Sequence, residues 1–296
     1  MLILDTSALR ALSGDKLKAL TKRHRVGISP ITFYELMCHL DDTNNDTTFD
    51  RQRGQVIKCA LVEMLPDPYA YHAHSDKAIF RTMNPSRFEE MRLVPQMIEL
   101  LKSSATLAEF YGKTLKFEDG AVGPLRAAAE KIRAELDADE KEYVNHVSKL
   151  RDIIAETHSH SQINSLGSAE LHSIISSALN ASVNIEEQDG NKLNDTLRTV
   201  LICGLYAHFG YKVWRTVVAM RKELQGGQFS ADPNDLEDGY IALYLRLFED
   251  DVLVTEDKGT IIAFNETLAA VRAHVQPGTD LGISVVRPGD VICLTT

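Results

Sequence analysis

The stretch Leu2-Ile3-Leu4-Asp5-Thr6-Ser7-Ala8-Leu9 decides the fold that we expect for this chain. Its apolar start ends at the acidic residue Asp5, and helix-forming residues continue from there to about Leu20. A short apolar run followed by residues that cap helices is typical of a strand that turns directly into a helix. The stretch therefore predicts a buried strand, an acidic turn at Asp5 and a helix.

The same order of strand and helix is predicted twice more before residue 70. Residues 26–29 form a brief apolar run, and Pro30 suits the first position of the helix that follows and contains Glu35. Residues 60–65 form a third run, which ends at Pro66-Asp67-Pro68 because proline lacks the N–H donor of a strand ladder. Each of these runs is predicted to be a strand.

The last part of the sequence returns to this order after a turn-rich segment. We expect a helix at residues 236–248, a strand at 252–255, a helix at 261–271 and a final strand at 283–286. Strands that alternate with helices favour a parallel sheet with right-handed crossovers. The predicted fold class is therefore α/β.

Residues 71–229 follow a different pattern of long helical segments without a convincing strand, and residues 127–150 are predicted to be a long solvated helix. The chain has 296 residues, which is more than the roughly 100–200 of a typical domain. We interpret residues 71–229 as a mostly α-helical insertion. Residues 1–70 and 230–296 would then form one discontinuous domain.

The composition is that of an ordinary soluble protein, with 44% hydrophobic and 25% charged residues. The net charge of -10 gives no overall attraction to a polyanion, so any contact with nucleic acid must be local. The longest apolar stretch, residues 199–220, contains His208, Lys212 and Arg215, which favours buried helices over a membrane span. Scattered cysteines and the lack of a signal peptide predict a reducing, cytoplasmic location without disulfides.

Four acidic residues are expected to meet at one edge of the sheet. Asp5 closes the first strand and Asp257 follows strand 252–255, and parallel sheets bind ligands outside the carboxyl ends of their strands. Glu35 and Asp238 lie in helices that border the same edge. Four carboxylates packed together repel one another unless divalent cations neutralise them. Oxygen ligands suit Mg2+ or Mn2+, which polarise a phosphodiester and activate water.

These motifs resemble those of PIN domains, a family of metal-dependent ribonucleases that includes many toxin components. Residues 2–9 are similar to the first motif of the family, and residues 31–36 are similar to its second. Residues 238–242 resemble the third motif and residues 253–257 resemble the fourth, in the order that the family has. Four matches in this order are more specific than any one of them alone.

The resemblance covers about residues 1–67 and 232–296, and it leaves the helical middle unexplained. It implies a PIN-like three-layer fold with a central parallel sheet, hydrolysis of RNA, and an RNA substrate with an antitoxin-like protein as a further partner. A homodimer stays open. The resemblance implies that the ligands of Mg2+ or Mn2+ are Asp5, Glu35, Asp238 and Asp257, that the residues ordering the site are Ser7 and Thr255, and that Asp235 can substitute for Asp238.

Each acidic residue also has a structural interpretation. Asp5 suits the N-cap of a helix, Asp238 suits its first turn, and Asp257 suits a turn before Lys258-Gly259. Glu35 taken alone fits a solvated helix. Two other functions stay open: a PIN-like protein- or RNA-binding module with weak catalysis, and a phosphatase or DNA-directed flap nuclease that uses the same acids.

Two further groups of residues favour ordinary structural roles. The pairs His72/His74 and His158/His160 lack the spacing of a zinc site, so we interpret them as surface or loop residues. Aromatic residues near Lys212 and Arg215, among them Tyr211 and Trp214, have apolar surroundings that favour core packing over contact with RNA.

Overall fold

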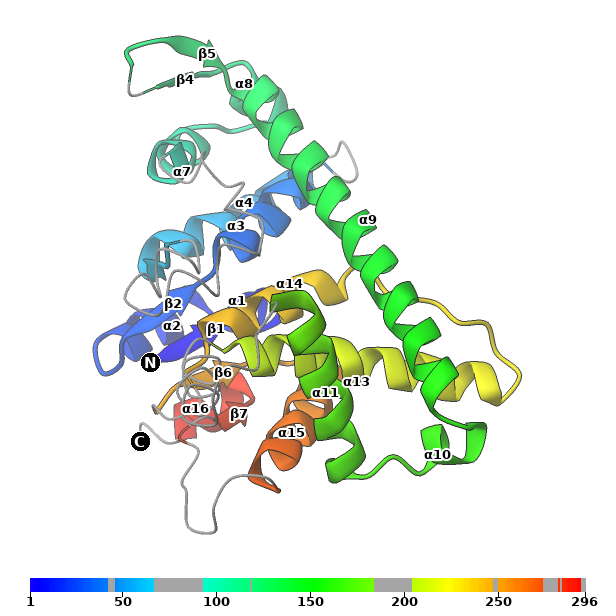
Figure 1. Ribbon diagram of the computed structural model, residues 1–296. Helices are drawn as coiled ribbons and strands as arrows, with labels where there is room; N and C mark the ends of the chain where they lie inside the picture. The colour runs from blue at the N-terminus through cyan, green and yellow to red at the C-terminus, as the bar shows by residue number, and fades with distance from the viewer. Residues whose placement is uncertain are drawn as a thin grey trace.

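The computed structural model describes residues 1–41, 46–66, 93–117, 119–183, 204–246, 250–273, 282 and 284–293. Its centre is a five-stranded parallel sheet with the strand order β3-β2-β1-β6-β7 (Figure 1). The strands are β1 (Leu2–Leu4), β2 (Val26–Ile28), β3 (Glu63–Met64), β6 (Val252–Val254) and β7 (Ser284–Val286). Leu2 pairs with Val26 on one side and with Val252 on the other, so β1 is central. The predicted α/β class with a parallel sheet is confirmed.

The third predicted strand, at residues 60–65, is wrong in its first half. Cys59–Leu61 forms a 3-10 helix, η2, and β3 contains only two residues. Strand β3 lies at the edge of the sheet, where Glu63 is exposed and its carboxylate accepts hydrogen bonds from Arg25 at 2.6 and 2.7 Å. The apolar residues before it pack against neighbouring helices instead of extending the ladder.

Four helices accompany the first two strands: α1 (Thr6–Ala11), α2 (Gly14–Thr21), α3 (Pro30–Cys38) and α4 (Asp46–Lys58). The single helix predicted to about Leu20 is therefore two helices. Leu12 is extended, and Ser13 caps α2 by accepting a hydrogen bond from the amide of Lys16. The ammonium group of Lys58 binds the carbonyls of Leu9 and Leu12 and so stabilises the end of α1.

The middle of the chain is mostly helical, as expected, but it is not without strands. Its helices are α7 (Val94–Lys102), α8 (Leu107–Tyr111), α9 (Leu125–Thr157), α10 (His160–Asn164), α11 (Ser168–Val183) and α13 (Leu205–Leu224). Strands β4 (Thr114–Lys116) and β5 (Val122–Pro124) form an antiparallel hairpin, so the prediction of no strand here is wrong. Helix α9 runs diagonally from this hairpin to α10 and includes the predicted helix at 127–150 (Figure 1).

The last part of the chain contains α14 (Asp235–Ile241), η4 (Ala242–Tyr244), α15 (Lys258–Arg272) and α16 (Pro288–Cys293). The helix predicted at 236–248 ends early, because the chain tightens into η4 and becomes extended at Leu245. The helix predicted at 261–271 is confirmed and starts at Lys258, where Asp257 caps it.

Helices of the predicted insertion share their hydrophobic cores with the sheet. Ile3 and Leu253 belong to one core with residues of α11, α13 and α15, whereas Leu4 and Val254 belong to a second core with residues of α3, α7 and α9. Helices α13 and α15 approach so closely that a Cβ on Gly210 would lie 2.2 Å from Cγ2 of Thr267. The domain bounds 1–70 with 230–296 and 71–229 stay a prediction.

None of the described helices combines the length and the apolar character that a membrane crossing requires. Residues 199–203 of the apolar stretch 199–220 lie outside the described part of the chain, and the rest belongs to α13. Within α13, Tyr211 is fully buried and Trp214 is partly buried against the first core, which agrees with core packing.

Candidate acidic active site

The carboxyl group of Asp5 lies at the end of β1, and only 2% of the residue is exposed. It is the N-cap of α1, with Oδ1 accepting a hydrogen bond of 2.6 Å from the amide of Ala8. The hydroxyl of Ser7 is 2.9 Å from each carboxylate oxygen. Burial raises the pKa of Asp5 to about 6, although hydrogen bonds from Thr255, Ala8 and Ser7 oppose this shift and the charge of Glu35 adds to it.

Ser7 and Thr255 join the two loops that follow β1 and β6. Their hydroxyl oxygens are 3.3 Å apart, and the hydroxyl of Ser7 accepts a hydrogen bond of 2.8 Å from the amide of Glu256. The hydroxyl of Thr255, which is fully buried, accepts a hydrogen bond from the amide of Asp257. Both residues therefore link Asp5 to the segment that contains Asp257. This is the position expected of a residue that orders the site.

Glu35 reaches the same edge from α3, which begins at Pro30 and is capped by Ser29. The hydroxyl of Thr6 is 2.7 Å from Oε2 of Glu35 and also contacts Oε1 of Glu237. This Oε1 atom of Glu237 accepts further hydrogen bonds from the hydroxyl of Thr32 at 2.8 Å and from the amide of Thr6 at 3.3 Å. Helices α1, α3 and α14 are thus joined through one carboxyl group.

Glu35 and Glu237 form a hydrogen-bonded carboxyl pair. Burial raises the pKa of Glu237 well above its usual value, and the charges of Glu35, Asp5 and Asp238 raise it further. Burial also opposes ionisation of Glu35, but hydrogen bonds from Glu237, His39 and Thr6 outweigh it and hold the pKa of Glu35 below its usual value. Of the two carboxyl groups, Glu237 is therefore the one that binds a proton more tightly.

Asp238 lies in the first turn of α14, and its Oδ2 atom accepts hydrogen bonds from the hydroxyls of Tyr211, at 2.9 Å, and Thr260. Burial raises the pKa of Asp238 to about 7, and the nearby charges of Asp5 and Asp257 contribute to this shift. Asp257 is exposed and caps α15 by accepting a hydrogen bond of 2.7 Å from the amide of Thr260. Thr260 thus contacts both Asp238 and Asp257.

Asp235 has a different environment. Its carboxylate is paired with Arg215 of α13, with Nη2 at 2.7 Å from Oδ1 and Nε at 2.8 Å from Oδ2. The hydroxyl of Tyr211 is 3.2 Å from Oδ1 of Asp235, so this hydroxyl separates Asp235 from Asp238. The charge of Asp235 is balanced by an arginine, unlike the charges of Asp5 and Asp238.

The opposite edge of the sheet shows how this fold holds a buried acid in a purely structural role. Asp251 immediately precedes β6 and is fully buried. Its two oxygens accept hydrogen bonds of 2.9 Å each from Nε and Nη2 of Arg246. Burial opposes ionisation, but the bonds to Arg246 outweigh it and lower the pKa of Asp251. Asp5 and Asp238 receive their hydrogen bonds from hydroxyl and amide groups instead.

The structure thus brings Asp5, Glu35 and Asp238 into one cluster, with Asp257 at its exposed side. The N-cap and first-turn roles considered for Asp5, Asp238 and Asp257 are also present. In the described residues, no three His, Cys, Asp or Glu side chains are arranged as a ready set of metal ligands. His158 and His160 are among the residues covered by that statement, whereas His72 and His74 lie outside the described part of the chain.

Sequence reasoning missed the part of Glu237 in the cluster. The sequence Asp235-Leu236-Glu237-Asp238 places three acids in one helical turn, and only Asp238 matches the expected motif. The signal that was available is the spacing: Asp235 and Asp238 are three residues apart and share one side of the helix, whereas Glu237 points in another direction and must have other partners. The sequence assigned the group that contains Tyr211 and Arg215 to core packing, and their contacts with the acids of α14 were not predicted because only the tertiary structure brings α13 beside α14.

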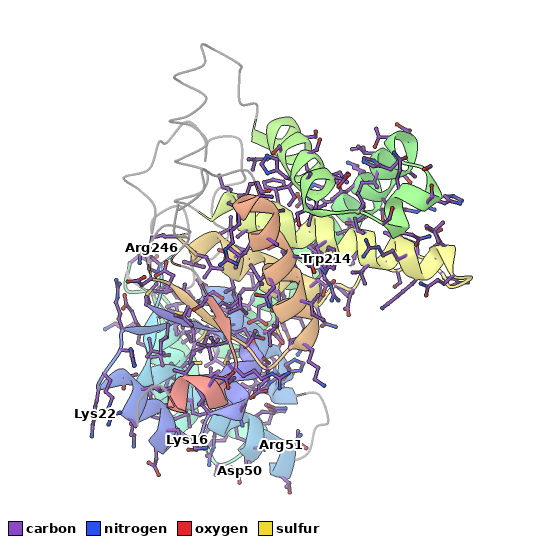
Figure 2. The ribbon with its side chains drawn as sticks, turned by 90° about the horizontal axis from the view of Figure 1, so that it is seen from below. Lys16, Lys22, Asp50, Arg51, Trp214 and Arg246 are labelled. Atoms are coloured by element: carbon purple, nitrogen blue, oxygen red, sulfur yellow. The ribbon has the colours of Figure 1, made fainter. Side chains whose placement is uncertain are left out.

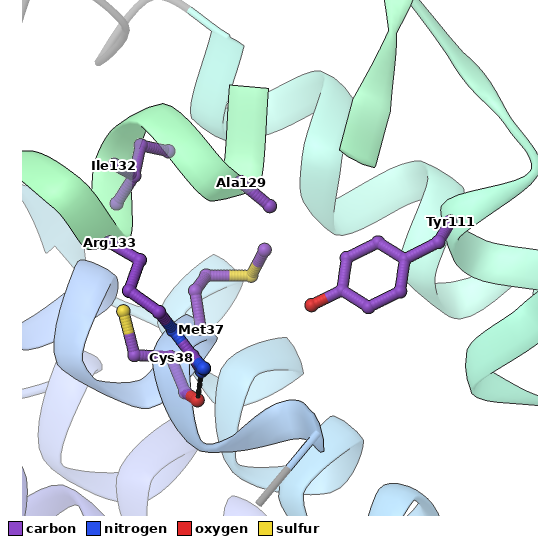
Figure 3. A pocket seen from close by; sticks show the side chains of 6 residues that line it. All are labelled: Met37, Cys38, Tyr111, Ala129, Ile132 and Arg133. Atoms are coloured by element: carbon purple, nitrogen blue, oxygen red, sulfur yellow. Dashed lines mark hydrogen bonds between the residues drawn. The ribbon is translucent and has the colours of Figure 1, made fainter. Parts of the chain in front are cut away.

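A small pocket elsewhere contains no acid. It lies between α3 and α9, where Arg133 donates a hydrogen bond to the carbonyl of Cys38 (Figure 3). Its lining residues are Met37, Cys38, Tyr111, Ala129, Ile132 and Arg133. This pocket offers no group that resembles the acidic cluster, which remains the candidate site.

Comparison with known proteins gives no relative: no family model, no curated protein and no solved structure matches this chain. The class that fold and site define is therefore an α/β protein with an acidic cluster at the carboxyl edge of a parallel sheet.

Glu237→Gln is expected to change the free energy of unfolding by less than about 1 kcal/mol, whereas Glu237→Ala should cost about 1–3 kcal/mol. A glutamine keeps the acceptor for Thr6 and Thr32 and can donate its amide N–H to Glu35 in place of the carboxyl proton. Alanine leaves these buried groups without a partner. Denaturant unfolding without added metal measures both values. Equal losses in the two variants would show that Glu237 is ionised in the folded protein.

Proposed function

We propose that this protein is a metal-dependent nuclease that hydrolyses the phosphodiester bonds of RNA. The observation that carries the proposal is the cluster of Asp5, Glu35 and Asp238, which come from three separate segments and meet at the carboxyl edge of the sheet. Burial raises the pKa of Asp5 and Asp238 to about 6 and about 7, so keeping them together is costly without a cation. Carboxyl groups whose pKa values are raised by burial and by neighbouring charges are typical of functional sites.

The residues present fit a divalent cation such as Mg2+ or Mn2+, because the donors are carboxylate oxygens. Asp5, Glu35, Asp238 and Asp257 would hold the ion. When bound, such an ion polarises a phosphodiester and lowers the pKa of its water. Ser7 and Thr255 would orient Asp5, since their hydroxyls already contact it or its loop. The carboxyl groups of Glu237 and Glu35 would share one proton.

Cations near the cluster offer local contacts for a phosphate backbone despite the net charge of -10. Arg10 is exposed. Burial of Glu35 raises the pKa of that residue, and the charge of Arg10 is one of the influences that lower it. Lys258 is exposed and adjacent to Asp257. Further exposed cations, Lys16, Lys22 and Arg51, lie on the side of the molecule formed by α2 and α4 (Figure 2). Of these residues, Arg10 and Lys258 are the candidates for binding RNA beside the cluster.

Cleavage assays on pooled RNA and on pooled single-stranded DNA test the proposal. We expect RNA to be cut with Mn2+ or Mg2+ and to stay intact when a chelator is added, because the acids alone activate no water. Cleavage that persists with chelator would contradict the role of the metal. Preferred cleavage of DNA, or release of phosphate from a monoester, would favour the flap nuclease or the phosphatase.

The second candidate function is a PIN-like protein- or RNA-binding module with weak catalysis. One observation favours it: among the described residues, no group of three His, Cys, Asp or Glu side chains is placed to hold a metal ion. Such a module would bind RNA without cutting it and would gain little stability from Mn2+. An antitoxin-like partner, a homodimer and a cytoplasmic location are part of the proposal.

A further inference from the structure

Arg215 lies beside the acidic cluster and is held at two of its three nitrogens. Nε and Nη2 bind the two oxygens of Asp235, which gives the fork-shaped geometry that fixes the plane of a guanidinium group. About a quarter of the Arg215 side chain is exposed, at 25%. The ion pair therefore orients the arginine while leaving part of it open to a ligand.

The third nitrogen, Nη1, is turned toward the start of α15. A Cβ built on Gly259 would lie 2.7 Å from Nη1 of Arg215 and 3.0 Å from Oδ1 of Asp257. The arginine can approach Asp257 this closely because residue 259 has no side chain. Nη1 and the Asp257 carboxylate therefore border the same small region.

A second buried polar group, the hydroxyl of Tyr143, lies within the electrostatic influence of Arg215. Tyr143 of α9 is 2% exposed, and its hydroxyl has no hydrogen-bond partner among the described residues. The charged groups that act on this hydroxyl include Asp235, Arg215 and Asp238. This hydroxyl is enclosed in the folded protein, so the exposed part of Arg215 is the group open to a ligand.

We propose that Arg215 contacts the phosphate of the RNA strand being cut, with Asp235 as the residue that positions it. The inference rests on the proposed nuclease function and deepens it, because it names the group that recognises the substrate. A guanidinium with one free edge matches the geometry of phosphate oxygens. Asp235 then orients Arg215, and the other acids hold the metal.

The charge-neutral double variant Arg215→Gln/Asp235→Asn tests the proposal, because it removes the guanidinium without leaving an unpaired buried acid. We expect kcat/KM for RNA to fall by about 10²-fold or more. In an Asp5→Asn background, which is expected to cut too slowly to disturb a binding measurement, the slope of log K against log salt for a short single-stranded RNA should become shallower by about 0.7. Arg215→Lys should keep that slope, because the charge remains, but cut more slowly.

Gly259→Ala provides a second variant, in which the added Cβ would lie 2.7 Å from Nη1 of Arg215 and 3.0 Å from Oδ1 of Asp257, so its free energy of unfolding is measured beside its activity. Its methyl group displaces Nη1, so we expect a loss of activity of at least about tenfold. Arg151→Gln/Glu223→Gln is the matched control, because it removes a similar arginine fork with bonds of 2.7 and 3.2 Å. We expect this control to cut like the wild type.

The outcomes separate this inference from the proposed function. Wild-type cleavage that is lost in Asp5→Asn but retained in both Arg215→Gln/Asp235→Asn and Gly259→Ala would overturn the role of Arg215 alone. An unchanged salt slope in the double variant would also overturn it. A wild-type protein that cuts neither RNA nor DNA overturns the proposed function and this inference together.

Discussion

Asp5→Asn is expected to lower the rate of RNA cleavage by about 10²–10³-fold while leaving the protein folded. Asp5 lies at the centre of the cluster, and its charge acts on both Glu237 and Asp238. Asparagine has nearly the same shape and still caps a helix through its side-chain oxygen. The hydrogen bond to the amide of Ala8 can therefore remain, while a negative ligand for the metal is lost.

The same substitution should raise the stability of the metal-free protein at pH 8. Burial raises the pKa of Asp5 to about 6, so ionising this group in the folded protein is unfavourable above that pH. A neutral asparagine avoids this cost, and we expect a gain of about 1–3 kcal/mol in the free energy of unfolding. A variant with less activity but more stability is typical of a site whose strain serves function.

Asp251→Asn is the matched control, because it changes a buried acid at the opposite edge of the sheet. Its ion pair with Arg246 would be broken, so we expect lower stability and unchanged cleavage per folded molecule. Thermal unfolding and single-turnover cleavage measure both properties. If Asp5→Asn cut RNA as well as the wild type, or if Asp251→Asn lost activity to the same extent, the acidic cluster would not be the active site.

The positions of the strands were predictable from the sequence wherever an apolar run ends at a polar turn. Strands β1, β2 and β6 are such runs with neighbours on both sides in the sheet, and β7 was found in the same way although it lies at an edge. Strand β3 did not, because an edge strand needs only a few pairing residues and its apolar neighbours packed elsewhere. The hairpin of β4 and β5 was missed because each strand has only three residues, too few for a clear alternation, and β5 contains a glycine and a proline, which disfavour strands.

The candidate site was predictable only where a residue is fixed by its own strand or helix. Asp5 and Asp257 stand at strand ends, so topology alone placed them at one edge. Glu237 could not be placed in this way, because its role depends on the hydroxyls of Thr6 and Thr32 from two other helices. Arg215 depends on the packing of α13 against α14, which no local pattern encodes.

Addition of Mn2+ at pH 7.5 is expected to raise the melting temperature by about 5–10 °C, and the same addition at pH 5 should have little effect. A ligand at 100 times its Kd stabilises the folded state by about 2.7 kcal/mol, and a protein of this size gains roughly 2–4 °C for each kcal/mol. At pH 5, protons on Asp5 and Asp238 compete with the metal, since burial raises their pKa values to about 6 and about 7.

Without metal, the free energy of unfolding should decrease as the pH rises. Both carboxyls have a higher pKa in the folded state than the value of 3.8 that applies when they are unfolded. The folded state therefore binds their protons more tightly, and the stability that this gives is complete below about pH 4 and is lost as the pH rises to about 7. Thermal unfolding at closely spaced pH values with a chelator should show a fall across this window.

The two measurements together decide between a nuclease and a binding module. In a nuclease, the cost of ionising Asp5 and Asp238 is offset when the cation binds, so the curves with and without Mn2+ should diverge as the pH rises. In a module that binds no metal, the two curves should coincide at every pH, because nothing compensates the ionised acids. Coincident curves from a protein that still binds RNA would exclude the metal-dependent mechanism, and Asp238→Asn should remove the divergence if that acid is a ligand.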